Sequence, residues 1–427
     1  MPASGRLTDL LEAGASINPA APALVEDGRV LSHMDLLVHV DALASLLQRW
    51  LGPGDRAPTG RIGPRVGVCA LNSIRHVTAF LAILRAGAVW VPINPHDGRE
   101  VNRTLVRQAD LDLLLVEADC AECVGTGSVS ALLIDEGGEL DRHLNRTLGD
   151  RPGTVPEGAE DIVCIRFVGT QGGRSRGVLL PARSFLSVQR TLERLFAPVA
   201  ADISLLAAPL SEDAAHFILP VLGAGGTHRL LRHAGPAGIL DALRQEVTLA
   251  YLPPAYLPLL LGERDFAPSD FPALRHLACG TEGLLPDLTA LALERFGPRL
   301  AVLFGLPEAP LTISTLGAAE MEEAGLRATV GPACEDSRIA LLGPDGVLRQ
   351  EPGAAGEVLV TGDLVMAGYL DAPVETEAAF HEGWLRTGEV GTLDDRGHLT
   401  LGTMDVSPSA GRQDGWPVDR PRHTVKA

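Results

Sequence analysis

A run of glycines, hydroxyl groups and basic side chains lies between two apolar segments, in the stretch FVGTQGGRSRGVLL (167–180). Glycine lets backbone N–H groups converge on an anion, and hydroxyl groups donate further hydrogen bonds. These residue types suit a phosphate loop made of Thr170, Gln171, Gly172, Gly173, Arg174, Ser175, Arg176 and Gly177. No Gly-Lys-Ser/Thr completes a Walker loop, and a plain connection between two strands is the alternative.

Alternating strands and helices would position this loop. VGVCA (66–70) is a short apolar strand, and Asn72 and Ser73 can cap the helix that follows it. A glycine ends that helix, and VWVPINP (89–95) resumes as a strand. The alternation returns after the loop, with a helix predicted over 214–222. This order predicts mostly parallel sheets covered by helices.

The character of the sequence changes near Gly331. Short alternating strands such as SRIALLG and GEVLVTG are separated by Gly, Pro and Asp turns, which is typical of a small β-rich subdomain. After Asp405 the chain is polar and rich in Pro, Gly and Arg. We therefore predict one domain over 1–405, with α/β subdomains of about 1–165 and 166–330, a β-rich subdomain over 331–405, and an irregular tail over 406–427.

The composition limits the binding partners and the cellular location that we expect. A net charge of -18 argues against nucleic acids and anionic membranes, since both would require a basic face. No apolar run approaches the roughly 20 residues of a membrane span. The N-terminal MPASGRLTDLLEAGA lacks the pattern of a secretory signal. We expect a cytoplasmic protein with neither a nucleic-acid nor a membrane partner.

The numbers and positions of cysteine and lysine residues limit two kinds of chemistry, metal binding and catalysis by a lysine. Of the six cysteines, Cys120 and Cys123 form a CxxC pair, but no second pair or close histidine completes a tetrahedral zinc site. The cysteines are therefore expected to be small buried hydrophobes. Lys426 is the only lysine among 36 basic residues. Codon bias can explain arginine on a surface, but it cannot supply a lysine where chemistry requires one.

Six segments occur in a recognisable order, over roughly 7–401. They are VGVCALNSIRHVTAFLAILRAGAVWVPINP, FVGTQGGRSRGV, AAPLSEDAAHFILPVLGAGGTHRLL, LACGTEGLLPDL, AVLFGLPEAP and GEVLVTGDLVMAGYLDAPVETEAAFHEGWLRTGEVGTLDDRGHL. In this order they resemble the adenylate-forming superfamily, which includes acyl-CoA synthetases, peptide-synthetase adenylation domains and luciferase. The resemblance implies the large α/β N-terminal domain of that fold, with two helix-covered, mostly parallel sheets and a small β-rich subdomain.

The resemblance also implies a nucleotide site for ATP or AMP with Mg²⁺. The phosphate loop would be residues 170–177, with Thr170 and Arg176 acting in catalysis and Arg176 in the place of the family's lysine. Glu308 matches the Mg²⁺-associated glutamate, and Glu389 stands where an aspartate holds both ribose hydroxyls. The adenine contacts would be Gly280, Thr281, Glu282, Phe304 and Gly305, with the Phe304 ring stacked on the base.

The acid substrate would occupy a pocket beside the nucleotide. The family's aromatic-histidine pair aligns with Ser211 and Glu212, and His216 would line the same pocket. A lone histidine in this apolar segment is more often a residue of the core or the pocket wall. The implied partners are a small carboxylic acid or acyl group, and an acceptor that is coenzyme A, a carrier protein or an amine.

The departures from the family pattern fall on catalytic positions. Pro307 replaces a threonine before Glu308, and Glu389 is one methylene longer than the usual aspartate. The run Gly402-Thr403-Met404-Asp405 lacks the arginine that contacts the nucleotide, a charge-assisted contact worth about 1.5–3 kcal/mol. Only 22 residues follow Asp405, where the family has a mobile lid that carries a lysine. We therefore expect a diverged member without the C-terminal lid domain.

Three functions are compatible with this pattern. The first is slow formation of an acyl- or aryl-adenylate, with a lid or an acceptor step supplied by another protein. The second is a catalytically degenerate binding or regulatory partner of a ligase or carrier protein. The third is acyl chemistry without ATP in the same pocket, for which the sequence offers no clear nucleophile–base pair. Nucleotide binding separates the first from the other two.

Overall fold

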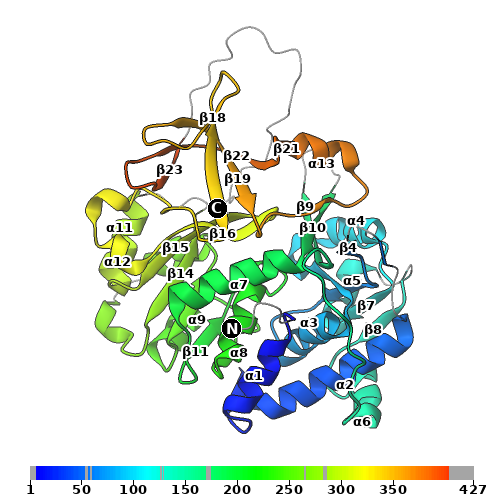
Figure 1. The fold of residues 1–427 in the computed structure, drawn as a ribbon. Helices are drawn as coiled ribbons and strands as arrows, with labels where there is room; N and C mark the ends of the chain where they lie inside the picture. Colours follow the sequence, from blue (N-terminus) through cyan, green and yellow to red (C-terminus); the bar gives the residue numbers. More distant parts are fainter. Residues whose placement is uncertain are drawn as a thin grey trace.

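The computed structural model describes residues 6–52, 56–57, 60–125, 127, 129–169, 175–263, 266–281 and 286–402. Two large sheets lie side by side with helices packed on their faces, and a small antiparallel sheet lies at one end of them (Figure 1). Among the described residues, none of the helices combines the length and the apolarity that a membrane span requires.

The first large sheet has eight strands within the described residues. Their spatial order is β16 (Ala309–Leu316), β15 (Leu300–Leu306), β14 (His276–Gly280), β13 (Leu249–Leu252), β11 (Ile203–Leu206), β12 (Thr227–Leu230), β1 (Pro22–Glu26) and β2 (Arg29–Ser32). The six inner strands are parallel, and β16 and β2 are antiparallel edges. Its helices are α1 (Asp9–Ile17), α7 (Ala182–Phe196), α8 (Ile218–Gly223), α9 (Pro236–Arg244), α10 (Tyr256–Gly262), α11 (Pro286–Phe296) and α12 (Ala318–Met321).

The second large sheet has seven strands within the described residues. Their order is β20 (Gly368–Tyr369), β10 (Ser175–Pro181), β9 (Ile162–Gly169), β6 (Val89–Ile93), β5 (Arg65–Cys69), β7 (Leu113–Val116) and β8 (Ala131–Leu133). Strands β8, β7, β5, β6 and β9 are parallel, whereas β10 and β20 are antiparallel additions. Its helices are α2 (His33–Leu51), α3 (Ile74–Ala86), α4 (Arg99–Ala109), α5 (Ala118–Val124) and α6 (Glu139–Thr147).

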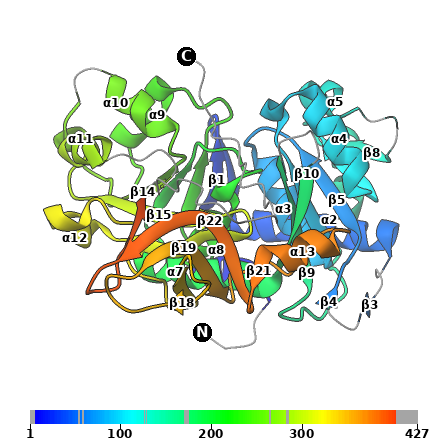
Figure 2. The same ribbon diagram turned by 90° about the horizontal axis from the view of Figure 1, so that it is seen from above.

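The β-rich region forms a curled antiparallel sheet. It contains β18 (Leu348–Arg349), β17 (Ser337–Leu342), β19 (Ala355–Gly362), β22 (Trp384–Leu393), β21 (Phe380–His381) and β23 (Leu399–Gly402), with α13 (Pro373–Ala379) beside it. Seen from above, β22 reaches across from the eight-stranded half, while α13 lies over the seven-stranded half (Figure 2). The short pair β3 (Arg56–Ala57) and β4 (Gly60–Arg61) and the 3₁₀ helices η1 (Pro95–Asp97), η3 (Asp213–Phe217), η4 (Pro268–Asp270) and η5 (Ala324–Leu326) complete the elements used below.

Strands cross between the two sheets in a way that their order along the chain did not indicate. β1 and β2 come from the N-terminal region but pair with the sheet built from residues 203–316. Conversely, β20 adds to the edge of the other sheet through β10. The boundary near residue 165 between two α/β subdomains stays a prediction.

Local sequence explains the end points of α3. The Ser73 hydroxyl accepts a hydrogen bond from the His76 N–H (3.1 Å), and Gly87 ends the helix with φ +72°. The helix predicted over 214–222 was wrong in its extent, because the chain forms η3 and only then α8. Pro220 has no N–H for residue 216 and its ring would clash with that carbonyl, so an α-helix cannot run through both.

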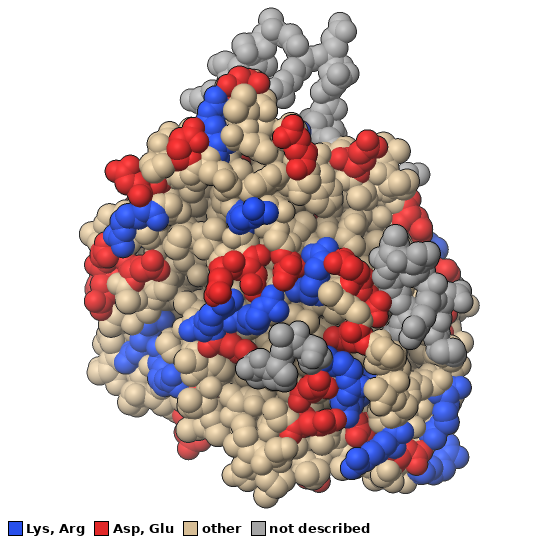
Figure 3. Space-filling model, in the orientation of Figure 1, with Lys and Arg blue, Asp and Glu red and all other residues tan. Residues whose placement is uncertain are grey.

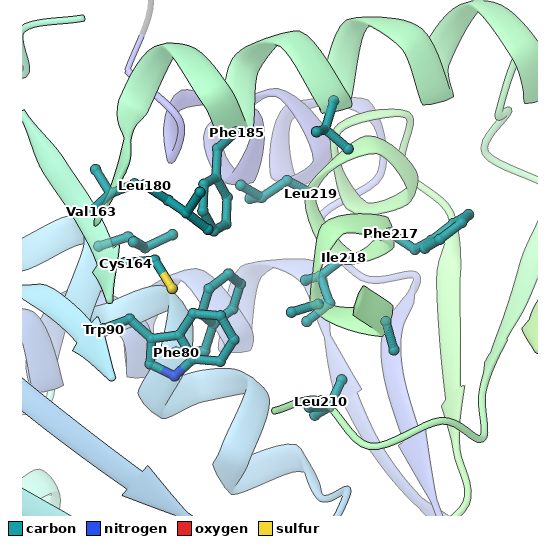
Figure 4. Close-up of a cluster of buried hydrophobic side chains, with 14 of the residues drawn as sticks. Phe80, Trp90, Val163, Cys164, Leu180, Phe185, Leu210, Phe217, Ile218 and Leu219 are labelled. Carbon is teal, nitrogen blue, oxygen red and sulfur yellow. The ribbon is translucent and has the colours of Figure 1, made fainter. Parts of the chain in front are cut away.

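The largest core cluster lies where the two sheets face each other. Phe80 of α3 and Trp90 of β6 approach from one half (ring centroids 4.5 Å apart), and Phe185 of α7 and Ile218 of α8 approach from the other (Figure 4). All four side chains are buried. The two sheets therefore share one continuous apolar seam beneath α7.

Asn72 joins the two halves by polar contacts. Its side-chain amide donates to the carbonyls of Leu206 and Ala208 (3.1 and 2.8 Å) and accepts from the N–H of Leu210 (3.0 Å). Ser73, and not Asn72, caps α3. The buried Asn72 side chain thus pairs three backbone groups at the end of β11, which fixes this strand end against the start of α3.

Ion pairs fasten the small sheet to α7. Arg190 Nε lies 2.8 Å from Asp336 Oδ2, and a second guanidinium nitrogen lies 3.2 Å from Asp363 Oδ2. The Arg183 guanidinium donates to the carbonyls of Asp363 and Val365 (2.8 and 2.6 Å). Acidic and basic side chains form an adjoining band over α7 (Figure 3). Because several charges are shared in one network, these contacts hold the sheet more firmly than isolated surface pairs would.

Candidate active site

Glu308 occupies a tight hairpin turn between β15 and β16. Leu306 pairs with Ala309, so Pro307 and Glu308 are the two central residues of the turn. Proline suits the first central position of such a turn, where its N–H is not required. The Glu308 side chain is 6% exposed, and its backbone carbonyl accepts from the Met366 N–H (2.8 Å). The turn thus presents one carboxylate at the end of the sheet.

Tyr369 connects this carboxylate to the predicted phosphate loop. Its hydroxyl donates to Glu308 Oε1 (2.8 Å), and its ring lies 5.2 Å below the Arg176 guanidinium carbon. The backbone of Tyr369 pairs with Val178 of β10, the strand that carries Arg176. A basic group and a carboxylate from distant segments therefore contact one tyrosine.

The central part of the phosphate loop lies outside the described residues, which include neither Thr170, Gln171, Gly172, Gly173 nor Arg174. Its flanks are β9 and β10, an antiparallel pair in which Ser175 faces Gly169 and Arg176 faces Val168. Gly177 closes the described part of the loop, and its carbonyl accepts from the Leu370 N–H (2.7 Å). The predicted loop is therefore the connection of a hairpin, and its phosphate contacts stay a prediction.

The predicted adenine contacts gather at the ends of β14 and β15. Gly280 is the last residue of β14, Thr281 follows it, and Glu282 lies outside the described residues. A Cβ at Gly305 would lie 2.1 Å from the Leu311 nitrogen, so only glycine fits this bulge of the hairpin. The Phe304 ring is 2% exposed and packs in the core, so stacking on adenine would require the ring to become accessible.

Glu389 lies at an irregular point of β22. Its N–H donates to Thr387 Oγ1 (3.0 Å), and Gly388 between them has φ +74°. The pairing of β19 with β22 shifts register here, which marks a β-bulge. A β-bulge changes the direction in which side chains point. The extra methylene of Glu389, relative to aspartate, therefore lies on a locally distorted strand. Its predicted ribose contact stays a prediction.

The predicted acid-pocket residues come from the segment that begins at Ser211. The Ser211 hydroxyl is buried and has no hydrogen-bond partner among the described residues. Glu212 Oε1 accepts from Asn94 Nδ2 (3.0 Å), which links the segment to the end of β6. His216 is buried against the Phe185 ring (centroids 4.6 Å apart). Burial lowers the pKa of its imidazole to about 4, so the ring is neutral at pH 7.

An ion pair lies beside these residues that the sequence did not reveal. The Arg166 guanidinium of β9 pairs with the Asp213 carboxylate of η3, and Tyr251 of β13 also hydrogen-bonds this carboxylate. Burial alone would raise the pKa of Asp213, but the Arg166 charge lowers it below its ordinary value. The pair spans both sheets, so it fixes the pocket segment and contributes charge to its surroundings.

An open cleft of about 370 Å³ lies at the carboxyl ends of parallel strands from both sheets. Ligands of open α/β sheets bind at such strand ends. Arg232, at its wall, forms a bidentate pair with the buried Glu117 (3.0 and 2.9 Å). The lining residues are Ala70, Leu71, Asn72, Pro95, His96, Ala207, Pro209, Arg232, His233, Ala234, Gly235 and Tyr256. The predicted pocket residues Ser211, Glu212 and His216 are not among these lining residues, although Glu212 bonds Asn94, which precedes Pro95 in the chain.

The donor set at Glu308 suits Mg²⁺ if phosphates complete the coordination. In the part of the chain that the structure describes, no group of three His, Cys, Asp or Glu side chains could hold a metal ion. Mg²⁺ commonly takes one or two protein carboxylates, with phosphate and water oxygens as its other ligands. A single buried carboxylate beside Arg176 is consistent with that arrangement and with no all-protein cage.

Tyr369 and Arg166 are the site residues that sequence reasoning missed. One signal was available for the tyrosine, because the chain has only three tyrosines and Tyr369 lies in a segment that resembles the family. Nothing in the local sequence indicated that Arg166 would pair with Asp213, since 47 residues separate them.

Comparison with known proteins shows which family the chain resembles in sequence. A family model described as AMP-binding enzyme matches residues 11–370. Feruloyl-CoA synthase from Amycolatopsis sp is 30% identical over 389 residues, covering 90% of this chain and 76% of that protein. Indoleacetate–CoA ligase from Aromatoleum aromaticum is 26% identical over 406 residues, covering 92% and 77%.

A solved structure confirms the predicted fold class. The N-terminal domain of FACL13 from Mycobacterium tuberculosis superposes with a TM-score of 0.82 at 21% identity, covering 93% of this chain and 100% of that chain. The α/β architecture with its small antiparallel sheet is therefore that of the N-terminal domain of adenylate-forming enzymes. With the family match across most of its length, the chain belongs to the AMP-binding enzyme family.

Proposed function

We propose that this protein activates a carboxylic acid by adenylation. The acid carboxylate would attack the α-phosphorus of ATP, forming an acyl- or aryl-adenylate and releasing pyrophosphate. The observation that carries this proposal is the contact of both Glu308 and Arg176 with Tyr369, beside the hairpin that bears the predicted phosphate loop. The names of the similar proteins, feruloyl-CoA synthase and indoleacetate–CoA ligase, support the same reaction class.

In this proposal the basic groups contact the negative phosphates, and the acidic group contacts the positive metal ion. Residues 170–177 hold the phosphates, and the planar Arg176 guanidinium supplies the positive charge at their edge. Glu308 provides a carboxylate for Mg²⁺, which neutralises phosphate charge when it is bound. Glu389 holds the ribose, and adenine lies against the ends of β14 and β15, at Gly280, Thr281, Glu282, Phe304 and Gly305.

The organic partners would use the cleft and its neighbouring segment. A volume of about 370 Å³ lies within the range of small-molecule sites, about 300–1,000 Å³. Ser211, Glu212 and His216 form the adjoining wall in this proposal, with the Arg166–Asp213 pair behind them. The acid is small, and the acceptor of the acyl group is coenzyme A, a carrier protein or an amine.

The altered positions lead us to propose a slow reaction that a second protein assists. Pro307, Glu389 and the run 402–405 replace residues that the family uses at the nucleotide. In this proposal the partner supplies the lysine that stabilises developing charge in the family, and Lys426 does not contribute. Unchanged activity in Lys426→Ala, together with a higher rate on addition of the partner, is the expected result.

One observation favours a second function, that of a catalytically degenerate binding or regulatory partner of a ligase. The Phe304 ring is 2% exposed and packed in the core, which leaves adenine without its expected stacking surface. A protein of this kind would keep the fold and the organic pocket but would not bind nucleotide.

Calorimetric titration with Mg²⁺-ATP and with AMP separates the two functions. Adenylation predicts saturable binding that Glu389→Ala weakens, since the substitution removes the proposed ribose contact. Glu382→Ala is a suitable control, because Glu382 lies in the same sheet region at the β21–β22 turn, outside the predicted contacts. Absence of heat with both nucleotides at millimolar concentration would exclude adenylation and favour the regulatory function.

A further inference from the structure

Three of the six cysteines meet at the end of β5. Cys69 is the last residue of β5, and Cys120 and Cys123 lie one helical turn apart on α5. The Sγ atoms of Cys69 and Cys123 are 3.7 Å apart, and the Cys69 thiol also hydrogen-bonds Cys120. All three are free thiols. The sequence showed the CxxC pair but not its third member, 54 residues away from Cys123.

The three thiols differ in access to solvent. Cys69 is fully buried and Cys120 is 4% exposed, whereas Cys123 is half-buried at the surface. An oxidant from solvent therefore reaches Cys123 first. The cluster is not assigned to a metal, because no set of three His, Cys, Asp or Glu side chains across the described ranges could hold one.

The surroundings of Cys123 favour its thiolate. Asn102 of α4 places its side-chain amide 3.8 Å from the sulfur, and the neutral thiol donates to the Cys120 carbonyl (2.9 Å). A hydrogen bond from Cys69 and the Asn102 amide lower the pKa of Cys123 to about 6 against the effect of burial. The pKa of Cys69 is raised, first by its bonds to Cys120 and Cys123 and then by burial. A thiolate beside a protonated thiol is the arrangement of an attacking and a resolving cysteine.

We propose that Cys123 and Cys69 form a reversible disulfide on exposure to a peroxide. The Cys123 thiolate attacks one peroxide oxygen, the O–O bond breaks, and the products are a sulfenic acid and a hydroxide ion, which takes a proton from solvent to become water. The Cys69 sulfur then attacks the sulfenic sulfur, the S–O bond breaks, and the hydroxide that leaves takes the Cys69 proton as a second water. Two thiols are oxidised and one peroxide is reduced. A dithiol reverses the reaction by exchange.

The local architecture permits the approach that the bond requires. A disulfide has sulfurs about 2.05 Å apart, so the two Sγ atoms must close by about 1.7 Å. β5 is held between β6 and β7, whereas α5 is a seven-residue helix at the surface that ends at Gly125 with φ +70°. The C-terminal turn of α5, which carries Cys123, is the part that moves.

Oxidation would also act on the cleft wall. Glu117, the residue before α5, accepts hydrogen bonds from Ser73 and Arg232 and from the Leu71 N–H (3.1 Å). Leu71 and Arg232 line the cleft. A bond between β5 and α5 closes a loop of 54 residues, which restricts the unfolded chain and raises the midpoint of thermal unfolding.

Peptide mapping of the peroxide-treated full-length chain tests the proposal. Hydrogen peroxide at a few equivalents should remove two of six titratable thiols, yield a Cys69–Cys123 cross-linked peptide and raise the unfolding midpoint, and dithiothreitol should reverse all three. In Cys69→Ser, peroxide should leave a Cys123 sulfenic acid that dimedone traps, with no gain in midpoint. Cys334→Ser, which removes a buried cysteine outside the cluster, should behave as the wild type.

Three outcomes would overturn the proposal. One is retention of all six thiols in the wild type at a dose that oxidises free glutathione. Another is a cross-link that joins Cys120 to either neighbour. The last is direct conversion of Cys123 to sulfinic acid while Cys69 stays reduced. None of these depends on the folding of a variant.

Discussion

Tyr369 donates a hydrogen bond of 2.8 Å to Glu308 Oε1, although 61 residues separate the two along the chain. The contact joins the β15–β16 turn to the β10–β20 edge of the other sheet. The same ring supports the Arg176 guanidinium at 5.2 Å. One tyrosine therefore holds a carboxylate and a basic group of the proposed nucleotide site in fixed relation.

Removing this hydroxyl tests whether the contact positions Glu308. Tyr369→Phe should lower the free energy of unfolding by about 1.5–3 kcal/mol, because a hydrogen bond to a buried charged group is lost. It should also weaken the Mg²⁺ dependence of nucleotide binding while leaving AMP binding without metal nearly unchanged. Denaturant unfolding and calorimetry measure the two effects.

Tyr256→Phe is the matched control for that substitution. Tyr256 is a half-buried tyrosine that lines the cleft, and its loss of a hydroxyl should change stability by less than about 0.5 kcal/mol. Equal effects of the two substitutions on stability would mean that the hydrogen bond to Glu308 does not contribute the predicted free energy.

The second prediction concerns the joint between the two sheets. Asn72→Ala should destabilise the protein by about 2–5 kcal/mol, because it leaves the Ala208 carbonyl and the Leu210 N–H without their partner and removes one of the two donors to the Leu206 carbonyl. Asn145→Ala, at an exposed position of α6, should lie within about 0.5 kcal/mol of the wild type. Chemical denaturation provides the measurement, and a loss below 1 kcal/mol in Asn72→Ala would refute this role.

The third prediction concerns the unusual length of the Glu389 side chain. Glu389→Asp restores the residue that the family resemblance leads us to expect, and it should tighten AMP binding by roughly tenfold, or about 1.4 kcal/mol. Glu389→Gln keeps the length but removes the charge, and it should weaken binding. Isothermal calorimetry compares the three proteins. Weaker binding by Glu389→Asp than by the wild type would show that the bulge of β22 is adapted to glutamate.

The fourth prediction is a loss of stability in mild acid from a buried histidine. Burial lowers the pKa of His228 from 6.5 to about 4, with His33 adding to the lowering and the bond to the Ile218 carbonyl (3.0 Å) opposing it. Between these values the unfolded chain binds the proton and the folded chain does not. The contribution to stability is therefore complete above pH 6.5 and is lost as the pH falls toward 4.

His228→Gln isolates this effect, because it can keep a donor near the Ile218 carbonyl but cannot titrate. Relative to its own stability at pH 7.5, the wild type should lose about 2 kcal/mol more than the variant at pH 5. Thermal unfolding at the two pH values measures the difference. Equal losses in both proteins would contradict a depressed pKa at this position.

The sequence predicted those parts of the fold that local chemistry specifies. The apolar run 66–70, the Ser73 cap and Gly87 were sufficient to predict β5, α3 and β6 within one or two residues, because each signal acts inside one element. The helix over 214–222 was wrong because the pattern of apolar residues was given more weight than the missing N–H of Pro220.

Contacts between distant segments could not be predicted in the same way. Tyr369 with Glu308, Arg166 with Asp213 and Cys69 with Cys123 each depend on which strands become neighbours, and periodicity does not encode that choice. Asn72 shows the limit most clearly, since its type suggested a helix cap but its amide instead pairs with backbone groups of the other sheet.

The most direct test of adenylation is acid-dependent exchange of labelled pyrophosphate into ATP, with Mg²⁺ and a panel of small aryl and aliphatic acids. Adenylation predicts exchange with at least one acid, and a fall of roughly 100-fold or more in Glu308→Gln but none in the exposed control Glu322→Gln. Exchange that Glu308→Gln leaves unchanged, or no exchange with any acid at saturating ATP, would contradict it.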